Sequence, residues 1–127
     1  MIVRIVNFTL CGINEEQYQH HAATIADGFN QWEGLVAKLW LRDPKTDTYG
    51  GAYLFADQAA ADASRDTVLF RNMESNPFFA DLSVREYEMI DHLTAITGGA
   101  LLQPDAANAP LRMEHRADAR RSPAGGQ

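Results

Sequence analysis

One lysine lies among aromatic side chains in the stretch of residues 38–55. Lys38 and Trp40 are two residues apart, as are Tyr53 and Phe55 beyond a short polar loop. Residues two apart on a strand point to the same face, so each pair shares a face. Aromatic walls with a few polar groups are typical of a cavity that binds a small molecule. Trp, Tyr and Arg are equally typical of a subunit interface, so both interpretations stay open.

Three polar side chains on other predicted strands are further candidates for the same cavity. Asn7, on the first strand, offers an amide that both donates and accepts hydrogen bonds. Arg85 and Tyr87 share one face of the last strand, and Arg85 is a second candidate cation if that face is the inner one.

The elements that position these residues follow from the pattern of apolar side chains. Residues 1–10 have the composition of a buried strand, and Asn14 is a good N-cap for a helix whose apolar stripe ends at Phe29. We expect strands at residues 35–42 and 50–55, helices at 58–66 and 69–75, and a last strand at 82–90. This order predicts an α+β, ferredoxin-like βαββαβ fold.

Each face of the predicted sheet needs a cover, and the two helices cover only one. The side that carries Leu35, Leu39 and Leu41 is smooth and aliphatic, so we expect it to meet the helices. Lys38 and Trp40 would then point to the uncovered face. A homodimer that packs sheet against sheet would cover that face and enclose a cavity in each subunit.

Other kinds of chemistry find little support in the sequence. The adjacent His20 and His21 point about 100° apart on a helix, so they do not make a pair of metal ligands, and we expect these histidines to be solvated. Cys11 is expected to be a small buried hydrophobe at a strand end. Gly50 and Gly51 lack the spacing of a phosphate-binding loop and indicate a bulge or a close backbone approach. We therefore predict neither a metal nor a cofactor.

Amino-acid composition limits the remaining classes of function. The chain has 127 residues and a net charge of −6, which disfavours nucleic-acid binding. No apolar run is long enough to span a membrane, no signal peptide is evident, and a single cysteine fits a cytoplasmic protein. We expect one domain at residues 1–99 and a Pro-, Ala- and Arg-rich tail at 100–127, partly disordered.

Two segments resemble a known family. The stretch "EGLVAKLWLRDPKTDTYGGAYLF", followed by "FADLSVREYEMIDHLTAITGG", is similar to the YdhR-type monooxygenases, within the wider group of antibiotic-biosynthesis-monooxygenase-like dimeric α/β barrels. The resemblance covers about residues 3–99. It implies a homodimer with one cavity per subunit, and an oxygenase that acts on phenols or quinols without metal or flavin.

The resemblance also implies roles for the candidate residues. Lys38 would stabilise a phenolate, Asn7 or Tyr87 would hydrogen-bond a substrate oxygen, and the aromatic body would be bound by Trp40, Tyr53, Phe55 and Arg85. The alternative is a non-catalytic or stress-associated dimer that binds a small ligand in the same cavity. Haem degradation is disfavoured, because no histidine is expected to face the cavity.

Overall fold

The computed structural model describes residues 1–99, and the predicted tail at residues 100–127 lies outside that range. The chain divides into a unit of Met1–Met89 and a second that begins at Ile90. In the second unit the described residues form one short helix, α4 (Asp91–Ile96), which was not predicted. None of the described helices is long and apolar enough to cross a membrane.

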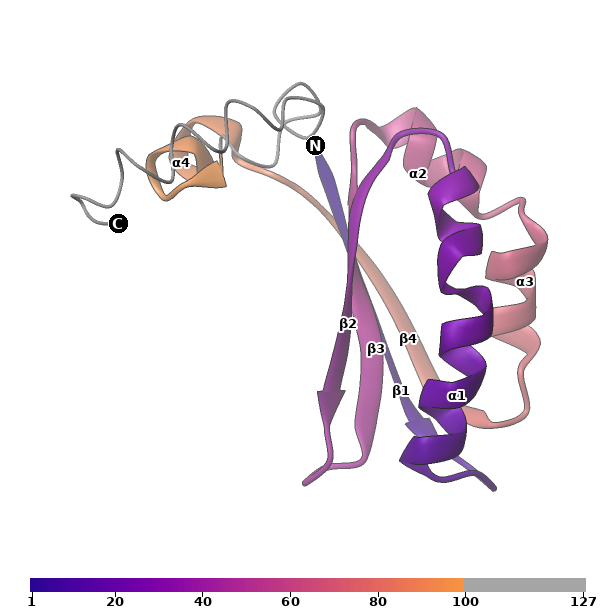
Figure 1. The fold of residues 1–127 in the computed structure, drawn as a ribbon. Coiled ribbons are helices and arrows are strands. Elements are labelled where there is room, and N and C mark those ends of the chain that lie inside the picture. Colours follow the sequence, from indigo (N-terminus) through magenta and orange to yellow (C-terminus); the bar gives the residue numbers. More distant parts are fainter. Residues whose placement is uncertain (100–127) are drawn as a thin grey trace, which may run out of the picture. The chain divides into compact units, whose positions relative to one another are not determined.

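The first unit is a four-stranded antiparallel sheet with all its helices on one face (Figure 1). Its elements are β1 (Ile2–Leu10), α1 (Glu15–Ile25), η1 (Ala26–Gln31), β2 (Leu35–Asp43), β3 (Thr48–Phe55), α2 (Gln58–Ser64), α3 (Val68–Ser75) and β4 (Phe79–Glu88). The strand order is β2-β3-β1-β4. The ferredoxin-like βαββαβ prediction is confirmed, although β4 begins three residues earlier than expected.

Side-chain caps fix where the helices start. Asn14 accepts a hydrogen bond from the backbone N–H of Gln17, whose side chain bonds back to Asn14 N–H in a capping box. Asp57 caps α2 and Thr67 caps α3, and each side chain accepts a hydrogen bond from the backbone N–H three residues later. The apolar stripe of α1 continues to Phe29 through the 3₁₀-helix η1, so Phe29 is buried against the sheet.

The assignment of the two sheet faces was wrong. Lys38 pairs with Tyr53 in the ladder between β2 and β3, and the Tyr53 ring is buried on the side of the helices. Lys38 and Trp40 therefore face the helices. Leu39 and Leu41 point the other way and are 50% and 42% exposed.

A register shift explains the error. The pairing of β2 with β3 slips between Leu35 and Ala37, which is a β-bulge. Leu35 therefore packs into the core with the helices, whereas the alternating residues after the bulge change sides. The helix-covered face is filled mainly by aromatic rings, and Leu39 and Leu41 of β2 lie on the face that the first unit leaves open.

Gly50 and Gly51 serve close packing, and the β3 ladder runs through them without a register shift, so the bulge interpretation was wrong. A Cβ on Gly50 would lie 1.8 Å from the carbonyl oxygen of Val6, which leaves no room for a side chain. A Cβ on Gly51 would lie 3.2 Å from Cε of Lys38 and 3.5 Å from the Tyr53 ring. The absence of a side chain at Gly51 thus leaves room for the side chains of Lys38 and Tyr53.

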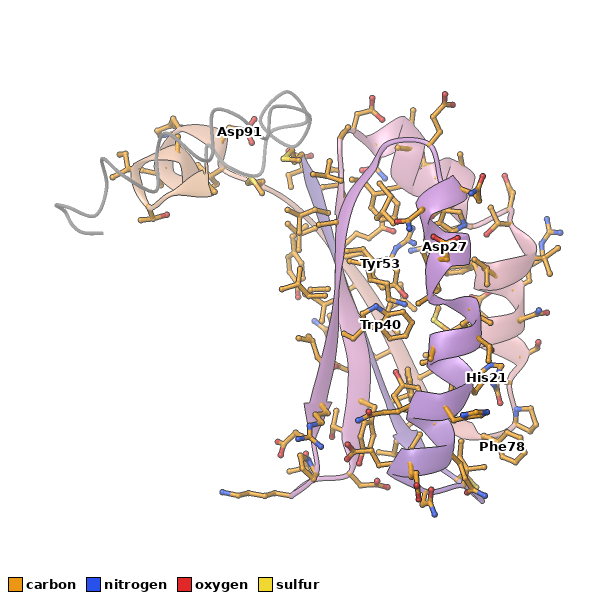
Figure 2. All side chains as sticks on the ribbon, in the orientation of Figure 1. His21, Asp27, Trp40, Tyr53, Phe78 and Asp91 are labelled. Atoms are coloured by element: carbon orange, nitrogen blue, oxygen red, sulfur yellow. The ribbon has the colours of Figure 1, made fainter. Side chains whose placement is uncertain are left out.

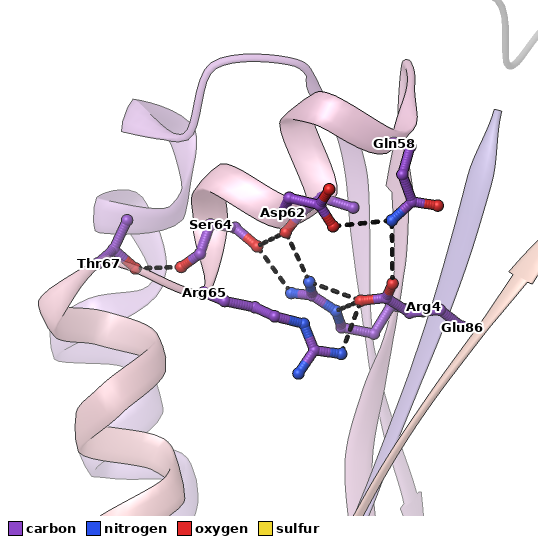
Figure 3. Close-up of polar contacts among 8 residues, drawn as sticks. Arg4, Gln58, Asp62, Ser64, Arg65, Thr67 and Glu86 are labelled. Carbon is purple, nitrogen blue, oxygen red and sulfur yellow. Dashed lines mark hydrogen bonds and ion pairs between the residues drawn. The ribbon is translucent and has the colours of Figure 1, made fainter.

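A buried arginine, Arg4, lies in a polar cluster between the sheet and α2 (Figure 3). Arg4 has no exposed surface, and its guanidinium donates to Glu86, Ser64 and the carbonyl oxygen of Ala61 at 2.8–2.9 Å. Glu86 also pairs with Arg65 at 2.9 Å. Burial favours a raised pKa for the Glu86 carboxyl, but the hydrogen bonds from the two arginines outweigh it and lower that pKa. Each of the three guanidinium nitrogens of Arg4 has a hydrogen-bond acceptor, which is typical of a structural ion pair.

Candidate active-site cavity

A cavity of about 540 Å³ lies between the sheet and the helices, in the middle of the first unit. Trp40 and Tyr53 extend from β2 and β3 into the space beside α1 (Figure 2). Apolar and aromatic side chains form most of the wall; those from α1, η1 and α3 include Tyr18, Ala22, Ile25, Phe29, Leu69 and Met73. The volume and the lining fit a site for a small organic molecule.

Lys38 lies in a cage of aromatic rings inside this cavity. Its Nζ is 3.4 Å from the ring centroid of Trp40, 3.6 Å from that of Phe29 and 4.7 Å from that of Tyr53. The Phe29 ring is in edge contact with the other two: its centroid is 5.7 Å from that of Trp40 and 6.1 Å from that of Tyr53. Such contacts hold the amine at one place and favour its cationic form.

The amine of Lys38 has no acidic partner within the described residues. No ion pair or hydrogen bond of this side chain occurs there, in contrast to Arg4. Burial lowers the pKa of Lys38 to about 7, because removal from water disfavours the charge. Both the ammonium and the neutral amine are therefore present near neutral pH.

Two buried hydroxyl groups and several polar side chains complete the wall. Burial raises the pKa of Tyr18 to about 12 and also raises that of Tyr53, so both phenols stay protonated and remain hydrogen-bond donors. Gln17, His21 and Asn72 add polar atoms to the lining. The cavity thus combines aromatic walls, one amine and a small number of donors.

Three predicted site residues meet in this cavity: Lys38, Trp40 and Tyr53. Phe55 lies on the same face of the sheet but does not line the cavity. Its ring is completely buried and the guanidinium carbon of Arg4 lies 4.7 Å from its centroid, so its place is in the core.

The other three predicted residues lie on the opposite face of the sheet. Asn7 pairs with Ser83, and Arg85 and Tyr87 are opposite Ile5 and Val3, which alternate with the buried residues of β1. Asn7 is exposed and Tyr87 is 52% exposed. The face assignment failed for β2 and β3, and this separated the seven candidates into two groups.

Phe29, Tyr18 and His21 are cavity residues that the sequence analysis did not select. Phe29 and Tyr18 belong to the apolar stripe of the first helix, which was interpreted as core alone. The small Ala22 within that stripe was the available signal, because a small side chain between aromatic ones leaves room. The expectation that no histidine faces the cavity was wrong, because His21 lines it.

Neither a metal site nor the expected buried thiol is present in the described part of the chain. No group of three or more His, Cys, Asp or Glu side chains could hold a metal ion within residues 1–99. Cys11 follows β1 and is exposed, which corrects its interpretation as a buried hydrophobe.

Comparison with protein families gives one match, which spans most of the chain. The family described as "Putative mono-oxygenase ydhR" matches residues 3–100. No curated protein is similar enough in sequence to count as a match.

Several solved structures share the fold at low sequence identity. An antibiotic biosynthesis monooxygenase from Deinococcus radiodurans, itself described as putative, is 14% identical, with a TM-score of 0.57 over 70% of this chain and 92% of its own. A variant of SnoaB, a cofactor-independent oxygenase from Streptomyces nogalater, is 16% identical, with a TM-score of 0.59 over 70% and 92%. MhuD from Mycobacterium tuberculosis, a haem degrader with two haems in its active site, is 17% identical, with a TM-score of 0.58 over 71% and 96%.

Proposed function

Since this chain belongs to the ydhR mono-oxygenase family, we propose that it oxidises a small aromatic phenol or quinol in the cavity beneath its helices, without a bound cofactor. The observation that carries the proposal is the amine of Lys38, held among three aromatic rings and without an acidic partner in the described residues. SnoaB, which is described as a cofactor-independent oxygenase, shares the fold, and this supports oxygenation as the class of reaction.

The chemistry needs an electron-rich substrate more than a cofactor. A phenolate passes an electron to dioxygen more readily than the neutral phenol does, so the substrate supplies the reducing power. In the net reaction a phenol and O₂ give a quinone and water: one oxygen atom enters the ring as a carbonyl, and the other takes up two protons. The protein has to bind the ring, favour the phenolate and exclude water.

Lys38 has the properties that are needed to favour the phenolate form of the substrate. Because the pKa of Lys38 is about 7, a neutral amine is available to accept the phenol proton. The resulting ammonium then lies beside the phenolate in a site of low polarity, where a charge pair is stronger than in water. The Tyr53 phenol, which stays protonated, is a candidate donor to the oxyanion.

The ring of the substrate would stack on Trp40. Trp40 is 41% exposed although it lines the cavity, so one part of its indole remains available to a ligand. Phe29 and Tyr53, which are buried, would form the rigid part of the wall.

Oxygen uptake with a panel of hydroquinones and anthrones tests this proposal. We expect uptake above background for the wild type and a loss of about 100-fold for Lys38→Met, as is typical when a general base is removed. Trp40→Ala should raise KM. Arg85→Met, on the open face, is the matched control and should keep full activity.

Three outcomes would contradict the proposal. Uptake that persists in the double variant Lys38→Met and Trp40→Ala would exclude the assigned site. Saturable binding of the aromatic compounds with no uptake would indicate a ligand-binding protein. A Soret band on titration with haem, lost in His21→Ala, would favour haem chemistry.

We further propose that two copies associate through the open face of the sheet. Leu39 and Leu41 of β2 expose large apolar side chains there, and Tyr87 of β4, at the other edge of the sheet, is half-exposed. The cavity itself lies within one chain, so association would cover this surface and is not needed to enclose the site. Light scattering should give a dimer, and Leu39→Glu with Leu41→Glu should give a monomer, whereas His20→Glu on α1 should not.

A further inference from the structure

The two lysines of the chain differ sharply in their surroundings. Lys38 is caged in the cavity, and Lys45 lies exposed in the turn between β2 and β3. This pair therefore offers one amine in an apolar site and one in water within the same molecule.

The surroundings of Lys38 favour reaction at nitrogen. Its Nζ faces the rings of Trp40, Phe29 and Tyr53, and among residues 1–99 no carboxylate side chain lines the cavity. A neutral amine has a free electron pair, whereas an ammonium has none, and desolvated lysines in apolar pockets are the ones that add to carbonyl groups. The lowered pKa agrees with the geometry, because it makes the neutral amine available near pH 7.

We propose that Lys38 forms a reversible imine with an aromatic aldehyde or ketone that binds in the cavity. This activity rests on the cavity and the amine alone, and it holds whether or not the protein is an oxygenase.

The reaction balances without an oxidant or a reductant. The electron pair of Nζ attacks the carbonyl carbon, a C–N bond forms, and a proton moves from nitrogen to the former carbonyl oxygen. The hydroxyl group then leaves as water with the second proton of the amine, which gives the C=N bond. Protonation of the imine produces an iminium cation, which the same three rings stabilise as they do the ammonium.

The aromatic character of the ligand follows from the wall. Trp40 and Phe29 lie within 3.6 Å of the nitrogen, so the carbon that bonds to it must lie against a ring face. A flat ring fits such a wall better than a flexible chain, because stacked or edge contacts add to the area that it buries. The cavity volume of about 540 Å³ accommodates one or two fused rings.

Reductive trapping with 2-naphthaldehyde and sodium cyanoborohydride at pH 7 tests the inference. Naphthaldehyde has no phenol group, so it is not a substrate for the proposed oxygenation. Mass spectrometry of peptides from the wild-type protein locates the label, and the N-terminal amine is mapped separately. We expect Lys38 to be labelled at least about 10-fold faster than Lys45, because far more of it is neutral at this pH.

Variants and a second aldehyde sharpen the result. Lys38→Arg keeps a cation but cannot form an imine, and should lose the fast label, whereas Lys45→Arg should keep it. Butanal should label Lys38 several-fold more slowly than naphthaldehyde does. Equal labelling of the two lysines in the wild type, or no label on Lys38, would overturn the inference, and this comparison needs no variant to fold.

The same samples separate this inference from the proposed function. Fast labelling of Lys38 with no oxygen uptake on any phenol leaves the imine chemistry standing and removes the oxygenase. Oxygen uptake without labelling removes the imine chemistry alone.

Discussion

Arg4 and Lys38 are two cations on the same face of the same sheet, and the structure treats them in opposite ways. Arg4 has a partner for its charge in Glu86 and further acceptors in Ser64 and the Ala61 carbonyl. Lys38 has aromatic rings around it, no hydrogen-bond acceptor within the described residues, and a cavity in front of it.

The different surroundings indicate different roles: Arg4 is a structural cation, and Lys38 is suited to a functional role. A buried charge that is fully hydrogen-bonded has no capacity left for a ligand, and it adds to stability only as part of its network. A buried amine that lacks partners costs folding free energy, and a protein keeps such a group where a ligand or a reaction uses it. We therefore expect substitutions at the two positions to change stability in opposite directions.

The largest effect on the free energy of unfolding is expected for Arg4→Met. This change leaves Glu86 with Arg65 as its remaining ion-pair partner and leaves the Ser64 hydroxyl and the Ala61 carbonyl without the guanidinium. Loss of one member of a buried pair costs about 3–5 kcal/mol. Urea denaturation should show a large drop in the free energy of unfolding, whereas Arg71→Met, at an exposed position of α3, should stay close to wild type. Equal stability of the two variants would refute the structural role of Arg4.

An effect of the opposite sign is expected for Lys38→Met. Each pKa unit corresponds to about 1.4 kcal/mol, so the lowered pKa of Lys38 represents a cost at neutral pH, which the contacts with the three rings partly offset. Methionine fills a similar volume without a charge. The free energy of unfolding should rise by about 1–3 kcal/mol while oxygen uptake and naphthaldehyde labelling disappear. A destabilised variant would show that the cage is mainly a structural cation–π site.

The pH dependence of stability should distinguish the same two cations. The pKa of Glu86 is lowered in the folded state, so its contribution is present above its unfolded pKa of about 4.3 and is lost as the pH falls below it. The pKa of Lys38 is lowered to about 7, so the unfolded chain binds more protons there between pH 7 and about 10.4, and stability rises with pH across that window. The gain from Lys38→Met should therefore be largest at or below pH 7 and vanish near pH 10. A gain that does not change with pH would contradict this assignment.

The sequence predicted the order of elements well because that order depends on local signals. Asn14 caps its helix as expected, and the apolar composition of residues 1–10 correctly predicts β1. The fold class follows from these signals and from the resemblance of the two segments, and the match of the family to residues 3–100 confirms the recognition.

The faces of β2 could not be predicted, because a bulge depends on contacts between strands. The slip after Leu35 changes the side of every later residue in β2, and no residue type marks it. The aliphatic leucines also suggested a core face, although apolar side chains serve a bare sheet face equally well. Asn7 and Tyr87 were therefore placed with Lys38, while Phe29, from the other wall of the cavity, was left out.

The smallest effect is expected for Gly51→Ala, and it tests whether the position of Lys38 matters beyond its presence. The added Cβ would lie 3.0 Å from the carbonyl oxygen of Leu39 and 3.2 Å from Cε of Lys38, so the flexible lysine must move by a few tenths of an ångström. Stability should fall by about 1 kcal/mol, as is common for slight overpacking, whereas Gly50→Ala should be far worse because its Cβ meets the Val6 carbonyl at 1.8 Å. If the aromatic cage positions the amine for reaction, naphthaldehyde labelling of Lys38 in Gly51→Ala should slow several-fold while labelling of Lys45 is unchanged. If the cage only desolvates the amine, the ratio of the two labelling rates should equal that of the wild type. That result would rule out a positioning role for the cage in the comparison with Arg4.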